Sequence, residues 1–233
     1  MIVDSNQFEI KIGVSFKDKS LIKQAFIHRS YINETVHTGL SHNERLEFLG
    51  DAVLELVVTD FLYKKYPNKQ EGDLTSYRAA LVNANIMGEI AMKDLGMSDY
   101  MMLSKGEAKD IGRARLSILA DAFEAVIGAL YLDQGYGACE KFIHDTILVH
   151  TEDLVKKGAW KDSKSLLQEK AQEKLGVTPV YKVIEEVGPD HDKRFVMGVY
   201  FGADMIGKGE GRSKQEAEQQ AAEAGLKEKG WTK

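Results

Sequence analysis

The most constraining feature of this chain is a group of acidic residues inside an apolar segment, HNERLEFLGDAVL, at residues 42–54. Glu44, Glu47 and Asp51 stand at positions i, i+3 and i+7, which places them within an arc of roughly 60° on one side of an α-helix. Carboxylates gathered in this way repel one another unless a cation lies between them. Because hard divalent cations such as Mg²⁺ prefer oxygen ligands, the segment predicts a helix with a metal-binding face.

A second acidic pair, Asp121 and Glu124, occurs among small and apolar residues in the segment LADAFEAVIGALYLD. Buried carboxylates are costly unless they are paired or bound to metal, so the pair is expected to close the same site from another helix. A structural ion pair to Arg45 or Arg115 is the alternative. No cluster of His and Cys accompanies these acids, which favours Mg²⁺ or Mn²⁺ over zinc.

Some of the acids also have ordinary structural explanations. Ser41 and Glu44 have the spacing of a capping box, in which Glu44 would only close the start of the helix. Glu47 would complement the helix dipole in the first turn, but Asp51 lies too far along the helix for that benefit. Glu55 shares the face of Asp51 and is expected to be a solvated surface residue.

Composition limits the classes of protein that this chain can belong to. With 233 residues and 43% hydrophobic residues it can form one large or two ordinary domains. The first residues lack a signal-peptide pattern, and no apolar run approaches the roughly 18 residues of a membrane span, so a cytoplasmic protein without membrane contact is expected. The single cysteine, Cys139, is expected to be a small core residue.

The overall charge is −5, and residues 162–233 contain 12 Lys and Arg against 13 Asp and Glu. Neither half of the chain is basic. Any binding to nucleic-acid phosphates must therefore come from the local placement of cations rather than from bulk charge.

Hydrophobic periodicity divides the chain into two domains. An apolar period typical of helices recurs before residue 154, in segments 21–27, 46–62, 81–95 and 116–132. We expect a helical domain at 1–154, a polar linker at 155–161 and a small α-β-β-β-α domain at 162–233.

The C-terminal pattern is specific enough to place each element of the second domain. A helix is expected over 164–176, with Asp162 or Ser163 as its N-cap and Gly176 at its end. Alternating apolar residues predict strands at 179–187 and 193–201 and a third near 204–208. Ser213 then caps a second helix.

The two acidic motifs, in this order, resemble those of the ribonuclease III family. The resemblance extends to LIKQAFIHRSY before the first motif, to EGDLT around Glu71, and to the C-terminal unit, which resembles a double-stranded-RNA-binding domain. It implies an all-α endonuclease domain followed by a small α+β RNA-binding domain.

The resemblance also assigns roles to individual residues. It implies four metal ligands, namely Glu47, Asp51, Asp121 and Glu124, and two acids that position substrate or water, namely Glu44 and Glu71. Phe48 matches the aromatic residue that packs into the partner subunit of a homodimer. Without the resemblance, Phe48 would be interpreted as an ordinary core residue.

The activity implied is Mg²⁺-dependent endonucleolytic cleavage of double-stranded RNA, with Mn²⁺ as a substitute metal. The expected products carry 5′ phosphates, 3′ hydroxyls and short 3′ overhangs, and the expected substrates are ribosomal RNA precursors and structured messenger or small RNAs. A dimeric scaffold that binds double-stranded RNA without cleaving it is the main alternative. A metal-dependent phosphohydrolase of small nucleotides is a weaker one, since a small substrate needs no duplex-binding domain.

Three regions of the C-terminal unit suit contacts to the minor groove and phosphates of A-form RNA, and all three match contact regions of the family. They are the first helix with Gln168, Glu169 and Gln172, the turn 188–191 with Pro189 and His191, and the helix start with Ser213 and Lys214. Gln215 and Glu218 stand where the family often has basic residues. We therefore expect modest RNA affinity from this domain alone.

Overall fold

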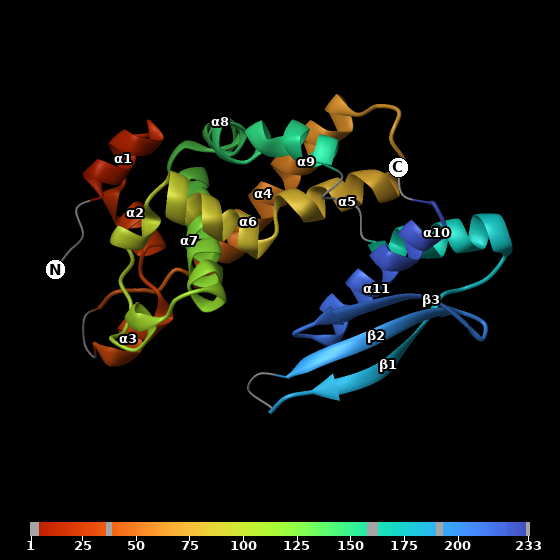
Figure 1. The fold of residues 1–233 in the computed structure, drawn as a ribbon. Helices are drawn as coiled ribbons and strands as arrows, with labels where there is room; N and C mark the ends of the chain where they lie inside the picture. Colours follow the sequence, from red (N-terminus) through yellow and green to blue (C-terminus); the bar gives the residue numbers. More distant parts are fainter. Residues whose placement is uncertain (1–4, 36–38, 158–162, 190–192, 232–233) are drawn as a thin grey trace. The chain divides into compact units, whose positions relative to one another are not determined.

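The computed structural model describes residues 5–35, 39–157, 163–189 and 193–231. The chain forms two compact units, Met1–Trp160 and Lys161–Lys233 (Figure 1). Residues 155–157 of the expected linker continue helix α9 (Thr151–Lys157), and 158–161 lie outside the described residues. The exact extent of the linker therefore stays a prediction.

The described part of the first unit is helical, as the sequence predicts. Its α-helices are α1 (Asn6–Ile12), α2 (Lys19–Ala25), α3 (Arg29–Glu34), α4 (Glu44–Lys65), α5 (Glu71–Leu81), α6 (Ala84–Glu89), α7 (Arg113–Gln134), α8 (Tyr136–Thr146) and α9. Short 3₁₀ turns occur at Met97–Asp99, Glu107–Lys109 and Leu148–His150, and a π-helical turn, Ile90–Asp94, extends α6.

The helical period expected over 81–95 is divided in the structure. Helix α5 ends at Leu81, and Asn83 begins α6 as its N-cap. The Asn83 side chain accepts a hydrogen bond from the backbone N–H of Ile86 at 3.0 Å and donates one to the carbonyl of Ala80 at 2.9 Å. Asparagine thus satisfies the backbone of both helix ends and separates them.

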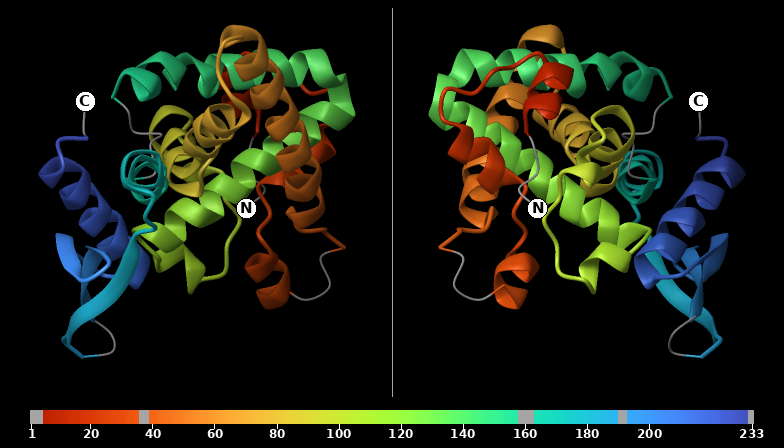
Figure 2. Two further views of the ribbon diagram at one scale, coloured as in Figure 1. Left: turned by 90° about the vertical axis from the view of Figure 1, so that its right-hand side faces the viewer. Right: turned by 90° about the vertical axis from the view of Figure 1, so that its left-hand side faces the viewer.

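Helix α7 forms the centre of the first unit. It contacts α2, α4, α6 and α8, and Figure 2 shows it running through the middle of the helical part. Most of its side chains between Leu119 and Leu130 are fully buried. A helix that is apolar on nearly every side has to be enclosed in this way, which makes Asp121 and Glu124 exceptional within it.

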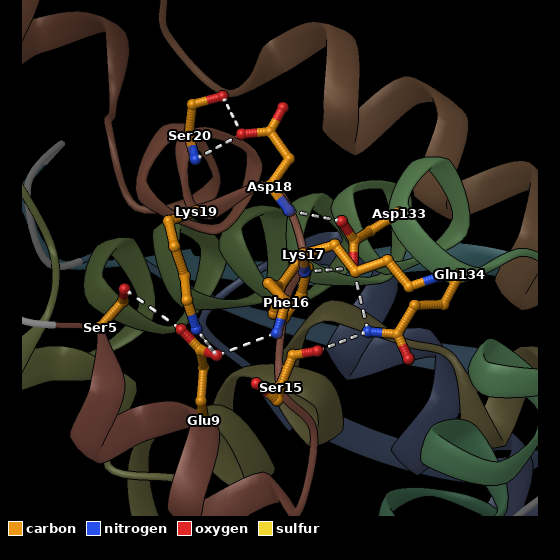
Figure 3. A network of polar contacts seen from close by, with 10 residues as sticks. All are labelled: Ser5, Glu9, Ser15, Phe16, Lys17, Asp18, Lys19, Ser20, Asp133 and Gln134. Carbon is orange, nitrogen blue, oxygen red and sulfur yellow. Dashed lines mark hydrogen bonds and ion pairs between the residues drawn. The ribbon is translucent and has the colours of Figure 1, made fainter.

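A polar network fixes the N-terminal helices to the end of α7 (Figure 3). The buried carboxylate of Glu9 accepts the backbone N–H of Phe16 at 2.9 Å and forms an ion pair with Lys19. Asp133, at the end of α7, accepts the backbone N–H groups of Lys17 and Asp18 at 2.9 and 2.8 Å. These carboxylates satisfy the backbone of the turn that precedes α2.

The second unit has the predicted α-β-β-β-α order. Its elements are α10 (Ser163–Leu175), β1 (Val180–Val187), β2 (Arg194–Phe201), β3 (Asp204–Gly211) and α11 (Lys214–Glu228), and the strands form one antiparallel sheet in the order β1-β2-β3. The third strand extends three residues beyond its expected end. The fold class expected from the sequence is therefore confirmed.

Local signals explain the ends of these helices. The Ser213 hydroxyl accepts the backbone N–H of Glu216 at 3.1 Å, as an N-cap does. Gly176 follows α10 with a φ of +66°, a conformation that glycine adopts at little cost. Ser163 is the first residue of α10 rather than its cap, and Asp162 lies outside the described residues.

Candidate metal centre

Helix α4 carries the first acidic group on its N-terminal turns. The helix begins at Glu44 with Asn43 in the N-cap position, so Ser41 is not placed to form the capping box considered above. Glu44 instead pairs with Arg29 at 3.0 Å, and its other oxygen lies 3.7 Å from Nδ1 of His42. Glu44 is thus contacted by the first residue of α3 and by the segment that precedes α4.

The second acidic group lies directly beside the first. Glu47 on α4 and Asp121 and Glu124 on α7 each offer a carboxylate oxygen, and these three oxygens lie within 4.8 Å of one another. All three residues are half-buried. The structure thus brings together acids that are more than seventy positions apart in sequence.

Two glycines allow this close approach. Helices α4 and α7 cross at Gly50 and Gly128, and a Cβ added at Gly50 would lie 1.8 Å from the carbonyl oxygen of Glu124. A Cβ added at Gly128 would lie 2.1 Å from the carbonyl oxygen of Leu46. Only glycine fits at either position, so this crossing sets the distance between the acidic faces of the two helices.

Burial and repulsion between neighbouring acids raise the pKa values of all three grouped carboxyls. Burial, followed by the charges of Asp51, Asp121 and Glu47, raises the pKa of Glu124 to about 8. Burial and neighbouring acids, Asp121 first, also raise the pKa of Glu47. Burial raises the pKa of Asp121, although His28 opposes this shift. A divalent cation would relieve this repulsion.

The competing account, an ion pair to arginine, finds no support among the described residues. Arg115 donates instead to the carbonyl of Ser98 at 3.2 Å, and Arg45 is exposed. Within the described part of the chain, no salt bridge joins a cation to Asp121 or Glu124. Half-buried carboxylates without such partners are better explained by a bound cation.

Asp51 and Glu55 differ in their surroundings although they share one face of α4. Asp51 is exposed at the edge of the cluster, close enough to raise the pKa of both Glu47 and Glu124. Glu55 pairs with Arg78 of α5 at 3.2 Å and does not belong to the group that offers a metal site.

Glu71 lies apart from the other five acids within this chain. It is the exposed first residue of α5, which begins after α4 has ended at Lys65. Asp51 precedes Lys65 by fourteen positions, which is about 21 Å of helix. The structure therefore gives Glu71 no place in the cluster of its own chain, and its expected role stays a prediction.

Phe48 is not a core residue. It follows Glu47 on α4 and is 82% exposed, so the alternative of ordinary core packing is wrong.

The expected RNA contacts of the second domain are mostly accessible. Leu167 and Ala171 of α10 are buried in the core. The polar and turn residues of the expected contact surface are exposed, namely Gln168, Glu169, Gln172, Pro189, Ser213 and Lys214. His191 lies outside the described residues. Glu218, one of the departures from a basic pattern, pairs with Lys164 at 2.6 Å.

Sequence reasoning missed two sets of residues that shape these sites. Gly50 and Gly128 were visible only as glycines within helical periods, which signals close packing without naming the partner. Arg29 and Glu186 carry no sequence signal that sets them apart from other charged residues. In the fold, Arg29 pairs with Glu44, and Glu186 pairs with Lys193 and Lys214.

The raised pKa of Glu124 predicts a pH-dependent stability of the metal-free protein. Folded Glu124 retains a proton up to about pH 8, whereas the ordinary pKa is 4.5, so the folded state binds more protons between these values. Its contribution to stability is complete below the ordinary pKa and is lost as pH rises through the folded pKa. Thermal unfolding in EDTA should show a falling melting temperature over this range, and the fall should be smaller in Glu124→Gln. Equal pH profiles for the two proteins would contradict the assignment.

The fold and the acidic site together define a two-domain protein with a carboxylate cation site in its helical domain. Residues 18–151 match the family profile described as Ribonuclease-III-like, and residues 163–229 match the double-stranded RNA binding motif. The chain belongs to the ribonuclease III family of endoribonucleases.

Individual relatives agree with this assignment. Ribonuclease 3 of Enterococcus faecalis is 46% identical over 226 residues, which cover 96% of each chain. Ribonuclease 3 of Borreliella burgdorferi is 43% identical over 222 residues, which cover 95% of this chain and 90% of the relative. The solved nuclease domain of ribonuclease III from Campylobacter jejuni aligns with a TM-score of 0.54 and 38% identity, covering 61% of this chain and 98% of that domain.

No described helix is both long enough and apolar enough to cross a membrane.

Proposed function

We propose that this protein cleaves double-stranded RNA by metal-dependent hydrolysis and leaves 5′ phosphates, 3′ hydroxyls and short 3′ overhangs. The observation that carries the proposal is the group of three carboxylate oxygens, from Glu47, Asp121 and Glu124, within 4.8 Å of one another. Family membership and the double-stranded RNA binding motif at 163–229 support the choice of substrate.

The residues present fit Mg²⁺, with Mn²⁺ as a substitute. The three grouped side chains are carboxylates, which are the hard oxygen ligands that these ions prefer. Glu47, Asp121 and Glu124 would hold the ion, with Asp51 at the edge as a fourth ligand. A bound Mg²⁺ supplies Lewis acidity that activates water and stabilises the departing 3′ oxygen.

The chain's own residues set the order in which metal and RNA bind. The acids of α4 and α7 repel the phosphate backbone while the site is unneutralised, so RNA is expected to enter productively only with metal. Glu124 must lose its proton to become a ligand, because only the carboxylate binds the ion well. We expect Glu44, which pairs with Arg29 at 3.0 Å, to orient substrate or water beside the site.

The proposed active form is a homodimer that places two sites across one duplex. Phe48 supports this proposal because an aromatic side chain that is 82% exposed is suited to a partner subunit. A solved structure of the Campylobacter jejuni nuclease domain is described as showing flexibility in a region involved in dimer formation.

Substitution Phe48→Arg should therefore shift the protein from dimer to monomer in sedimentation velocity and weaken self-association at least about tenfold, as expected for a buried interface aromatic. Ile10→Arg is the matched control, since Ile10 is 75% exposed on α1. A Phe48→Arg protein that remains as fully dimeric as the Ile10→Arg protein would contradict the proposed interface.

The second domain is proposed to hold the duplex through its minor groove and adjacent phosphates. These contacts would be made by the exposed polar residues of α10, by Pro189 and His191, and by Ser213 and Lys214 at the start of α11. Natural substrates would be ribosomal RNA precursors and structured messenger or small RNAs in the cytoplasm.

The direct test is incubation of a long perfect RNA duplex with and without Mg²⁺, followed by analysis of the ends. Mg²⁺-dependent fragments with 5′ phosphates, 3′ hydroxyls and short 3′ overhangs are expected. Tight binding without cleavage in Mg²⁺ or Mn²⁺ would instead favour the non-catalytic scaffold.

A further inference from the structure

One carboxylate in the second domain lies between Lys214, an expected RNA contact, and a second lysine, Lys193. Glu186, near the end of β1, pairs with Lys193 at 3.2 Å and with Lys214 at 3.0 Å, each through a different oxygen. Both lysine ammonium groups also lie over the ring of Phe195, at 6.0 and 5.4 Å from its centre. The acid and the two cations therefore form one small cluster.

The positions of the lysines give this cluster its significance. Lys193 comes two residues after the segment 188–191 in the sequence, and Lys214 is the first residue of α11. That segment and the start of α11 are two of the three regions that would contact RNA. Two oxygens of one carboxylate, each facing one lysine, present the same charge and acceptor atoms as the non-bridging oxygens of a phosphate.

We propose that Glu186 is an internal substitute for an RNA phosphate, which occupies Lys193 and Lys214 and so weakens the binding of duplex RNA by this domain. The inference rests on the proposed function and deepens it. A bound RNA must either displace the Glu186 carboxylate from the lysines or place its phosphate backbone beside that negative charge. In both cases the two lysines contribute less to the free energy of RNA binding.

The charge balance of the domain agrees with this role. Residues 162–233 contain 12 basic and 13 acidic residues, and Lys164 at the start of α10 is likewise matched by Glu218 at 2.6 Å. A domain whose cations are paired internally binds short duplexes weakly. Stable binding then requires a duplex long enough to occupy the metal centre and the RNA-binding domain together, which makes Glu186 a determinant of selectivity for long duplexes.

The test compares Glu186→Gln with a control that removes an equivalent charge elsewhere. Glu210 pairs with Arg194 at 3.2 Å and both side chains are 56% exposed, so Glu210→Gln reports the general effect of losing one acid. Both changes are made in the full chain with Glu124→Gln, which blocks cleavage. Binding of a short RNA duplex is measured by fluorescence anisotropy over a series of salt concentrations.

Glu186→Gln should bind about three- to fivefold tighter than its parent, because each exposed ion pair contributes little. The slope of log affinity against log salt should steepen by about one. Adding Lys214→Gln should abolish most of the gain. Affinity that is unchanged, weaker or raised no more than in Glu210→Gln would overturn the inference while leaving the proposed function intact. A parent protein that binds no duplex RNA would refute both.

Discussion

Glu124→Gln is expected to slow cleavage of duplex RNA by at least about 1000-fold, because loss of a direct metal ligand should exceed the 10- to 100-fold cost of losing an outer-shell partner. The amide keeps the size of the side chain but carries no charge for a cation. RNA binding should change little, since the second domain is untouched. Single-turnover cleavage at saturating protein separates these two effects.

The matched control for this substitution is Glu55→Gln. Glu55 lies on the same face of α4, four residues after Asp51, but it pairs with Arg78 at 3.2 Å and stands outside the metal group. Cleavage by Glu55→Gln should remain within about threefold of the parent, since exposed ion pairs contribute little. Equal loss of activity in both variants would contradict the assignment of the ligands, and so would full activity in Glu124→Gln.

Gly50→Ala is expected to destabilise the protein by about 3 kcal/mol, at the upper end for overpacking a core. The added methyl carbon would lie 1.8 Å from the carbonyl oxygen of Glu124 and 2.8 Å from the backbone nitrogen of Gly128, and backbone atoms cannot swing aside as a side chain can. The helices must separate, which moves Glu47 away from Asp121 and Glu124. Cleavage by the protein that remains folded should fall about 100-fold, as displacements of about 1 Å can cost that much.

Gly72→Ala provides the control for Gly50→Ala. Gly72 lies in α5, and a Cβ there would meet no atom within 4 Å. Because alanine favours helix more than glycine does, Gly72→Ala should be neutral or stabilise the protein by up to about 1 kcal/mol. Chemical denaturation measures both changes. If the Gly50→Ala protein were as stable and active as the Gly72→Ala protein, the close contact of α4 and α7 at Gly50 would not be required, which would contradict this prediction.

The acidic site shows what sequence periodicity can predict and what it cannot. The spacing of Glu44, Glu47 and Asp51 placed them on one face because a helix has a fixed period. The closeness of that face to Asp121 and Glu124 was a hypothesis, because the register between two helices depends on which side chains meet at their crossing. The fold supplies that register through Gly50 and Gly128.

Phe48 and Asn83 show two limits of local patterns. Hydrophobicity alone favoured a buried Phe48, yet it is 82% exposed, because the apolar chemistry of one side chain does not determine whether the fold covers it. Apolar residues continued a helical period through residue 83, but the Asn83 side chain binds the backbone on both sides and ends one helix there. The hydrogen bonds of the Asn83 side chain therefore divide a segment that hydrophobic periodicity alone predicted to be one helix.

The α-β-β-β-α order was predictable because turn, cap and alternation signals agreed along the whole second domain. The ion pairs on its surface were not predictable, since Glu186 is separated from Lys214 by two strands and a turn. Only the pairing of β1 with β2 and the packing of α11 bring such charges together.

The most direct test of the account is the position of Mn²⁺ in crystals of this protein, located by its anomalous scattering. The account predicts an ion held by the carboxylates of Glu47, Asp121 and Glu124, at oxygen distances of about 2.0 to 2.3 Å. Crystals grown with saturating Mn²⁺ that show no ion between α4 and α7, or an ion only at other residues, would contradict it.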